Sequence, residues 1–212
     1  DVDPDTYNLD PESVESVLRR TDDVAALLPV HLYGRPAPMN HIADIAETYD
    51  LALVEDAAQA HGAEVDGRRV GSLGDAACFS FYPTKNMTTG EGGMVTTDRD
   101  DVAEAVARFV NHGRGESAYE HVSVGHNLRL TSLAAAIGLA QLEKLPAYTR
   151  VRRRNARLLS EGLEGAPVTT PTDPENGRHV YHLYTIEHET RDRLADHLER
   201  AGIGTAVYYP TP

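Results

Sequence analysis

Two short apolar runs with a helix-patterned segment between them constrain the fold of this chain most strongly. Residues 25–32 and 51–54 are predicted to be buried strands, and residues 38–49 have apolar side chains at helical spacing. A strand, a helix and a strand in this order predict a right-handed parallel crossover. The second strand leads directly into Glu55 and Asp56. Asp56 is therefore expected at the carboxyl end of a strand, where open α/β sheets bind ligands.

The rest of the chain extends this α/β pattern. Asp10 and Pro11 suit the cap and first position of a helix that ends near Arg20. A long helix is expected to start near Thr131, to be interrupted at Pro146 and to resume as far as Leu163. Apolar patterning predicts the other elements: strands at 76–82, 93–97, 181–186 and 204–209, and helices at 100–111 and 191–201. The pattern of predicted elements changes at 146–165. This change divides the chain into an α/β domain, 1–150, and a smaller α+β domain, 151–212.

Composition narrows the possible partners. The net charge of −13 repels nucleic-acid phosphates, and no apolar stretch reaches the ~18 residues that a membrane helix needs. The single cysteine, Cys78, cannot form an internal disulfide, so a cytoplasmic location is expected. Only two of the 20 basic residues are lysines, Lys85 and Lys144. An acidic, lysine-poor chain indicates a high-salt cytoplasm, and the alternative is an acidic mesophilic protein.

Lys85 lies between a predicted strand and a glycine-rich turn, in the run Ser80 to Met94. Partial desolvation on such a tight loop disfavours the charged form of an amine and makes it a nucleophile for an aldehyde cofactor. A surface lysine in a hairpin loop is the alternative. The segment Gly90-Glu91-Gly92-Gly93 lacks the GxxxxGK[ST] order and precedes a strand, so a nucleotide-binding loop is not predicted.

Asp56 begins a second cluster, with small residues on either side of Gln59 that leave room for a flat ligand. An ionised aspartate facing a pyridine nitrogen keeps that ring protonated and electron-withdrawing. Helix capping is the alternative role for Asp56. Because Lys85 follows 29 positions later, the pair favours the cofactor interpretation.

The chain resembles the DegT/DnrJ/EryC1/StrS family of aminotransferases, which depend on pyridoxal phosphate (PLP) and act on nucleotide-linked keto-sugars. The similarity covers nearly the whole chain in family order. The matching motifs are VHLYG, EDAAQAHGA, GSLGDAACFSFYPTKNMTTGEGGMV, NHGR, YEHVSVGHNLRLTSLAAAIGLAQL, YHLYTI and GIGTAVYYPTP. Relative to this family, an N-terminal segment and the end of the small domain are missing, so we expect an incomplete chain.

The resemblance implies a PLP fold type I large domain and five site residues. Lys85 would bind the cofactor covalently and move a proton, and Asp56 would pair with the pyridine nitrogen. Gln59 would lie against the ring near its hydroxyl, and Ser80 would bind the phosphate. Asn127 would reach the cofactor phosphate of a neighbouring subunit, which implies a homodimer. The amino donor is expected to be glutamate and the acceptor a keto-sugar nucleotide.

Other polar residues and other functions remain open at this point. Arg114 and Arg129 are candidates for binding a substrate phosphate or a donor carboxylate. The histidines lack metal-ligand spacing, so hydrogen bonding in loops or in the core is predicted for them; they include His61, His112, His121 and His126. The alternatives to an enzyme are a non-catalytic PLP-binding regulatory or truncated protein and a nucleotide-sugar-binding module without PLP.

Overall fold

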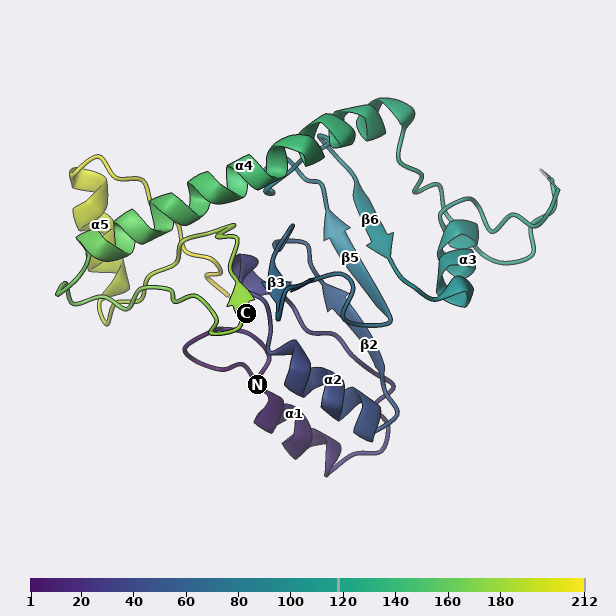
Figure 1. Cartoon of the computed structure of the whole chain (residues 1–212), viewed down its shortest axis with the longest axis horizontal. Coiled ribbons are helices and arrows are strands. Elements are labelled where there is room, and N and C mark those ends of the chain that lie inside the picture. Colours follow the sequence, from purple (N-terminus) through teal and green to yellow (C-terminus); the bar gives the residue numbers. More distant parts are fainter. Residues whose placement is uncertain (118, 212) are drawn as a thin grey trace.

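The computed structural model describes residues 1–117 and 119–211. Its centre is a mixed, mainly parallel sheet with strand order β1-β2-β5-β6 (Figure 1). Strands β1–β2 and β2–β5 pair in parallel, and β5–β6 pair antiparallel. The strands are β1 (Ala26–Leu27), β2 (Ala52–Asp56), β5 (Ala76–Ser80) and β6 (Gly93–Thr96). This arrangement confirms the predicted α/β class, with the parallel β1–β2 pair joined through a helix.

Two helices, α1 (Pro11–Leu18) and α2 (Met39–Thr48), lie side by side next to β2 (Figure 1). The side chain of Asp10 accepts hydrogen bonds from two backbone amides in the first turn of α1, which confirms the predicted cap. Apolar side chains at helical spacing join the two helices to the strands; the buried residues include Val14, Leu18, Ile42, Ile45 and Leu53. This core fixes the position of β2, and therefore of Asp56.

A second sheet links distant parts of the chain. Its order is β4-β3-β7, formed by β3 (Glu64–Val65), β4 (Arg68–Arg69) and β7 (Gly177–Arg178). Both pairings are antiparallel. The remaining elements are the 3₁₀ turn η1 (Leu32–Gly34) and the helices α3 (Asp100–Phe109), α4 (Ser132–Gly162) and α5 (Arg191–Arg200). Pairing of β3 with β7 brings the later third of the chain onto the α/β core.

The helix α4 is continuous through Pro146, so the predicted interruption is wrong. A proline removes one backbone N–H and crowds the preceding turn. Two flanking residues, Leu145 and Thr149, are buried, and Leu145 packs in a cluster with Phe81 and Met87. Tertiary packing on both sides of the proline therefore keeps the helix in place.

Replacing Pro146 with alanine is expected to stabilise the protein by about 1–3 kcal/mol, because alanine restores the missing hydrogen bond and favours the helix interior. Urea unfolding measures the change. Ala147→Gly on the same exposed stretch of α4 is the control, and it should lose about 0.5–1 kcal/mol. A destabilised Pro146→Ala protein would contradict this account of α4.

Three predicted strands differ from the structure. The strand at 25–32 is shortened to β1, with a separate parallel bridge between Val30 and Asp56. Residues 181–186 do not form a strand. The carbonyls of Tyr181 and His182 accept hydrogen bonds from the side chain of Arg152 and so are not available to the amides of a neighbouring strand. Residues 204–209 likewise form none, since among the described residues no strand pairs with them. The predicted domain boundary at 150 falls inside α4.

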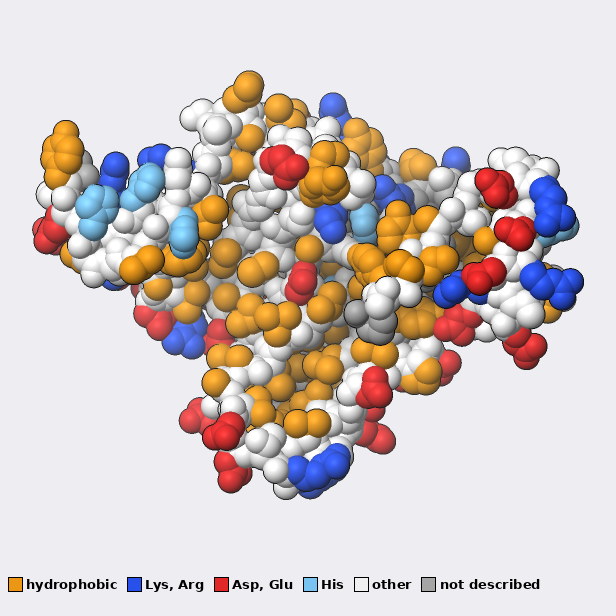
Figure 2. All heavy atoms as spheres, turned by 180° about the vertical axis from the view of Figure 1, so that it is seen from behind, with side chains coloured by type: hydrophobic (Ala, Val, Ile, Leu, Met, Phe, Trp, Pro, Cys, Tyr) orange, Lys and Arg blue, Asp and Glu red, His pale blue; other side chains and the backbone are white. Residues whose placement is uncertain are grey.

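The helices α1 and α2 cover one face of the sheet, and the opposite face is not covered by them. Figure 2 shows hydrophobic side chains gathered over the centre of the molecule on this rear view. Cys78 and its β6 neighbour Val95 are exposed, and no residue of α3 is buried. The first half of α4 adds further exposed apolar side chains: Leu133, Ile137, Leu139 and Leu142. Within the described ranges, no helix is both long enough and apolar enough to cross a membrane.

Candidate functional site

Asp56 and Ser80 lie at the carboxyl ends of neighbouring parallel strands. Asp56 is opposite Cys78 in the β2–β5 register, and Ser80 follows Cys78 by two residues. Because side chains alternate along a strand, all three point to the same face of the sheet. Partial burial raises the pKa of the Cys78 thiol, and the charge of the Asp56 carboxylate raises it further. The structure therefore brings a carboxylate and a hydroxyl to the same edge of the sheet.

The Asp56 carboxylate is held by one local bond. Its Oδ1 accepts a hydrogen bond from the backbone N–H of Ala58 at 3.0 Å. In the part of the chain that the structure describes, Oδ2 has no donor within hydrogen-bond distance. This orients the side chain while one oxygen stays available for a ligand.

Gln59 is buried three residues after Asp56, and both ends of its amide are held. Its Oε1 accepts a hydrogen bond from the backbone N–H of Tyr33 at 2.7 Å. Its Nε2 lies 3.0 Å from the hydroxyl of Tyr209. The amide is therefore fixed at the same strand edge, in contact with the later part of the chain.

Lys85 lies in the loop that joins β5 to β6. The loop is closed by a hydrogen bond from Phe81 N to the carbonyl of Gly92 at 2.8 Å, and Lys85 N donates to the carbonyl of Tyr82 at 3.0 Å. The Lys85 side chain is half-buried. The backbone at Lys85 is therefore held in a closed loop after the carboxyl end of β5, and the role of its amine stays a prediction.

His61 is a residue of this region to which the sequence interpretation gave no role in the site. Its ring is buried against Phe79 and Phe81, with centroid distances of 5.4 and 5.9 Å. Burial lowers the pKa of His61 to about 4; the backbone of Ser80 opposes this lowering, and the charge of Lys85 adds to it. Among the described residues neither ring nitrogen has a partner at hydrogen-bond geometry. The predicted hydrogen bonding of His61 is therefore wrong, because apolar rings surround it.

Asn127 lies apart from the other predicted site residues. It forms an antiparallel bridge with Asn111, and its exposed side chain accepts a hydrogen bond from Arg129 Nε at 3.0 Å. Figure 1 shows this segment, drawn in teal beyond α3, on the far side of β6 from β2. Within one chain, the structure therefore does not bring Asn127 or Arg129 to Asp56 and Lys85.

The neighbour of Asp56, Glu55, points to the opposite face and forms a buried polar centre. His31 Nε2 lies 3.0 Å from Glu55 Oε2, and His31 Nδ1 accepts a hydrogen bond from Ala37 N. The proton of the neutral imidazole is therefore on Nε2 and is donated to Glu55. Three backbone amides also donate to Glu55 at 2.8–2.9 Å, from Gly71, Leu73 and Gly74.

These four donors determine the charge state of Glu55. Burial alone would raise the pKa of Glu55, but the hydrogen bonds from His31 and from the 71–74 turn outweigh burial and lower it. An ionised Glu55 therefore holds the 71–74 turn against the end of β2. This centre positions Asp56 but faces away from the candidate site.

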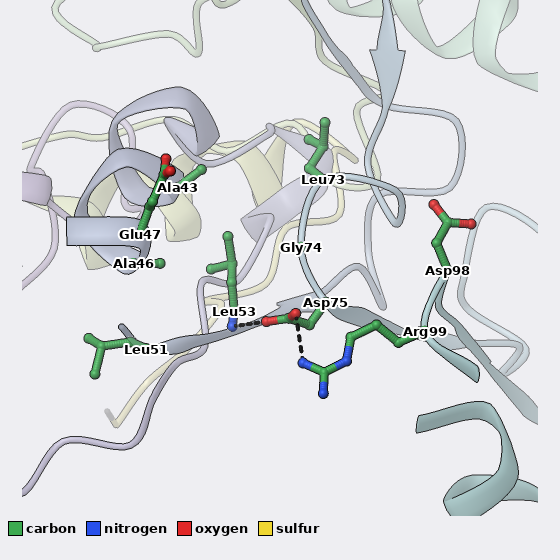
Figure 3. A pocket seen from close by; sticks show the side chains of 10 residues that line it. All are labelled: Ala43, Ala46, Glu47, Leu51, Leu53, Leu73, Gly74, Asp75, Asp98 and Arg99. Carbon is green, nitrogen blue, oxygen red and sulfur yellow. Dashed lines mark hydrogen bonds and ion pairs between the residues drawn. The ribbon is translucent and has the colours of Figure 1, made fainter. Parts of the chain in front are cut away.

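A separate cavity of about 310 Å³ lies between α2, the start of β2 and residues 73–75 and 98–99 (Figure 3). The side chain of Asp75 lines the cavity. Its carboxylate accepts hydrogen bonds from the backbone N–H of Leu53 at 2.8 Å and from Arg99 Nη1 at 3.1 Å. These bonds lower the pKa of Asp75. Leu51 and Leu53 place the cavity at the amino end of β2, opposite the end that bears Asp56.

The residues at the carboxyl edge fit the groups of PLP. The Asp56 carboxylate oxygen without a described protein donor suits a pyridinium N–H, the Ser80 hydroxyl suits a phosphate, and the amine of the half-buried Lys85 suits an aldehyde. A comparison with family models matches the DegT/DnrJ/EryC1/StrS aminotransferase family over residues 1–212. The chain belongs to this family. Aminotransferases of the family depend on PLP.

Several known proteins are similar along the whole chain. It is 44% identical to a pleiotropic regulatory protein of Geobacillus stearothermophilus, with 100% of this chain and 57% of that protein covered. It is 42% identical to a dTDP-3-amino-3,4,6-trideoxy-alpha-D-glucose transaminase of Streptomyces venezuelae, with 98% and 55% covered. A DegT DnrJ EryC1 StrS aminotransferase from Brucella abortus has a similar structure, with a TM-score of 0.94, 36% identity, and 100% and 58% covered. The chain thus spans a little over half the length of these relatives, and its fold is that of PLP-dependent aminotransferases.

Proposed function

We propose that the protein transfers an amino group from glutamate to the carbonyl carbon of a keto-sugar nucleotide, with PLP as cofactor. The single observation that carries the proposal is the half-buried Lys85, five residues after Ser80 at the end of β5, with Asp56 at the same end of the neighbouring strand β2. The names of similar proteins support the substrate class: they include transaminases of dTDP- and UDP-linked sugars.

Each residue has a distinct task in this proposal. When bound, PLP supplies an electron sink for the carbon from which a proton is removed. Asp56 binds the ring nitrogen and keeps it protonated, and Gln59 holds the ring edge with its fixed amide. Ser80 binds the phosphate. Lys85 holds the cofactor and then moves the proton between the donor carbon and the cofactor.

The proposal requires two separable half-reactions. PLP-loaded protein mixed with glutamate alone should yield 2-oxoglutarate in an amount equal to the sites. After removal of glutamate, added keto-sugar nucleotide should be converted to the amino sugar in the same amount. Asp56→Asn should slow the first step by about 10²-fold or more, because the ring nitrogen loses its anionic partner. Loaded protein that releases no 2-oxoglutarate would contradict the proposal.

A regulatory role is the second candidate, since the relative that is 44% identical is named a pleiotropic regulatory protein. Such a protein would bind PLP through Lys85 but would not turn over. The first half-reaction separates the two: stoichiometric 2-oxoglutarate supports the transferase, whereas a bound cofactor that glutamate leaves unchanged supports the regulator.

We also infer a homodimer in which Asn127 serves the site of the neighbouring subunit. Its exposed position away from Lys85 and the exposed apolar side chains of α4 support this. Mixed Lys85→Ala and Asn127→Ala proteins provide the test. If sites are shared, each variant alone is inactive, and a hybrid has one site with both residues intact. Mixing that restores no activity would argue against sharing.

A cytoplasmic, high-salt setting is a further part of the proposal. The net charge of −13 and the presence of only two lysines support it, because dense carboxylates repel one another at low ionic strength. Thermal unfolding in increasing KCl provides the test. A melting temperature that rises into the molar range supports the halophile, and one that levels off near 0.2 M supports the acidic mesophile.

A further inference from the structure

The residue after the candidate lysine is buried and joins two distant parts of the chain. Asn86 Nδ2 donates to the carbonyl of Val180 at 3.4 Å, and Asn86 Oδ1 lies 3.2 Å from His182 Nδ1. These contacts span more than 90 residues of sequence. Lys85 is therefore one peptide bond from a side chain that attaches its loop to residues 179–183.

The segment 179–183 is itself anchored. Arg152 on α4 donates to the carbonyls of Tyr181 and His182 at 3.0 and 3.1 Å. The amide of Val180 donates to the carbonyl of Gly34 at 2.9 Å. Gly34 has φ +92°, and a Cβ there would lie 2.8 Å from His182 N, so the segment packs directly on the backbone of η1. Asn86 thus attaches the lysine loop to a fixed frame.

The two hydrogen bonds of Asn86 also determine the tautomer of His182. Because Asn86 Nδ2 is the donor to Val180, Asn86 Oδ1 must be the acceptor for the Nδ1–H of His182. Burial lowers the pKa of His182 to about 4, so the ring is neutral at neutral pH and Nε2 bears a lone pair. The charge of Lys85 contributes to this lowering, as does His61.

We propose that Asn86 and His182 are positioning residues for Lys85: their hydrogen bond fixes the loop that carries the lysine against residues 179–183. This inference rests on the proposed function, because a fixed orientation of the lysine amine matters only if the amine reacts with the aldehyde of PLP. The contacts that support it exist without cofactor.

Competitive labelling of the two lysines tests this proposal. Lys144 is exposed on α4 and serves as the internal reference. In Asn86→Ala, acylation of Lys85 by a small amine-reactive ester should rise several-fold relative to Lys144, because the loop is released. Capture of limiting PLP at Lys85, trapped with borohydride and mapped by peptide mass spectrometry, should fall about tenfold, because the amine is no longer oriented. We therefore expect acylation of Lys85 to increase and capture of PLP at Lys85 to decrease in the same variant.

Two variants of His182 provide the matched pair. In His182→Asn, the side-chain amide can donate to Asn86 as Nδ1 does, so acylation of Lys85 should stay near the wild-type rate. In His182→Ala, acylation should rise as in Asn86→Ala. Circular dichroism verifies that each variant is folded. If Asn86→Ala does not fold, the comparison of His182→Asn with His182→Ala tests the proposal.

The proposal is overturned if the Lys85:Lys144 ratios in Asn86→Ala stay within about twofold for both reagents, a change too small to reflect a lost hydrogen bond. It is equally overturned if both ratios rise together, or if His182→Asn and His182→Ala behave alike. Wild-type protein that captures no PLP at Lys85 would instead contradict the proposed function, while the acylation ratios would still test the positioning role.

Discussion

Lys85→Ala should eliminate the near-ultraviolet or visible absorbance band that PLP develops on the wild-type protein. The band requires a covalent bond between the aldehyde and an amine, and Lys85 is a half-buried residue in the loop that follows Ser80. Amino transfer should fall by at least about 10²–10⁴-fold, because the residue that moves the proton is absent. Absorbance spectra of protein mixed with PLP, followed by added glutamate, measure both effects.

Lys144→Ala is the matched control for this experiment. Lys144 is the other lysine of the chain, is exposed on α4, and lies outside the strand edge that bears Asp56. Its replacement should leave the band and its response to glutamate unchanged. Spectra recorded at low and high salt prevent a folding defect at low ionic strength from obscuring the result. A band that persists in Lys85→Ala would remove Lys85 from the proposed mechanism.

Glu55→Ala is expected to destabilise the protein by about 3–5 kcal/mol, the usual effect of removing one partner from a buried charged network. The change leaves His31 and the backbone amides of the 71–74 turn without an acceptor in a region from which water is excluded. Urea unfolding followed by circular dichroism measures the loss. Glu199→Ala on the exposed face of α5 is the control, and it should change stability by less than about 0.5 kcal/mol.

Acid unfolding provides a second readout of the same centre. Because the folded-state pKa of Glu55 lies below its unfolded value, the stabilisation is complete above the unfolded pKa. It decreases as pH falls through the folded pKa. Glu55→Gln cannot ionise and should lack this component, so its stability should depend less on pH in the acid range. Parallel stability curves for the two proteins would contradict the role assigned to Glu55.

Local patterns predicted the elements that position the site. The apolar run before Asp56 became β2, and the cap at Asp10 formed as expected, because both depend on residues close in sequence. The resemblance supplied the roles of Gln59 and Ser80, and the structure places both residues beside Asp56, although their contacts with a cofactor remain predictions.

Features that depend on distant contacts could not be predicted from the sequence. His31 and Glu55 are 24 positions apart, and only the folded parallel strands bring them together. Strands of two residues, such as β3 and β7, are too short for periodicity to indicate. The continuity of α4 depends on the burial of Leu145 rather than on helix propensity, which is why Pro146 misled the prediction.

The unbroken α4 has a mechanical consequence. A helix of 31 residues is a rod of roughly 46 Å, and residues on both sides of position 150 belong to it. Leu145 packs beside the lysine loop, while Arg152 binds the segment that contacts Asn86. A rotation of α4 about its own axis would therefore displace the loop with Lys85 and the segment 179–183 together.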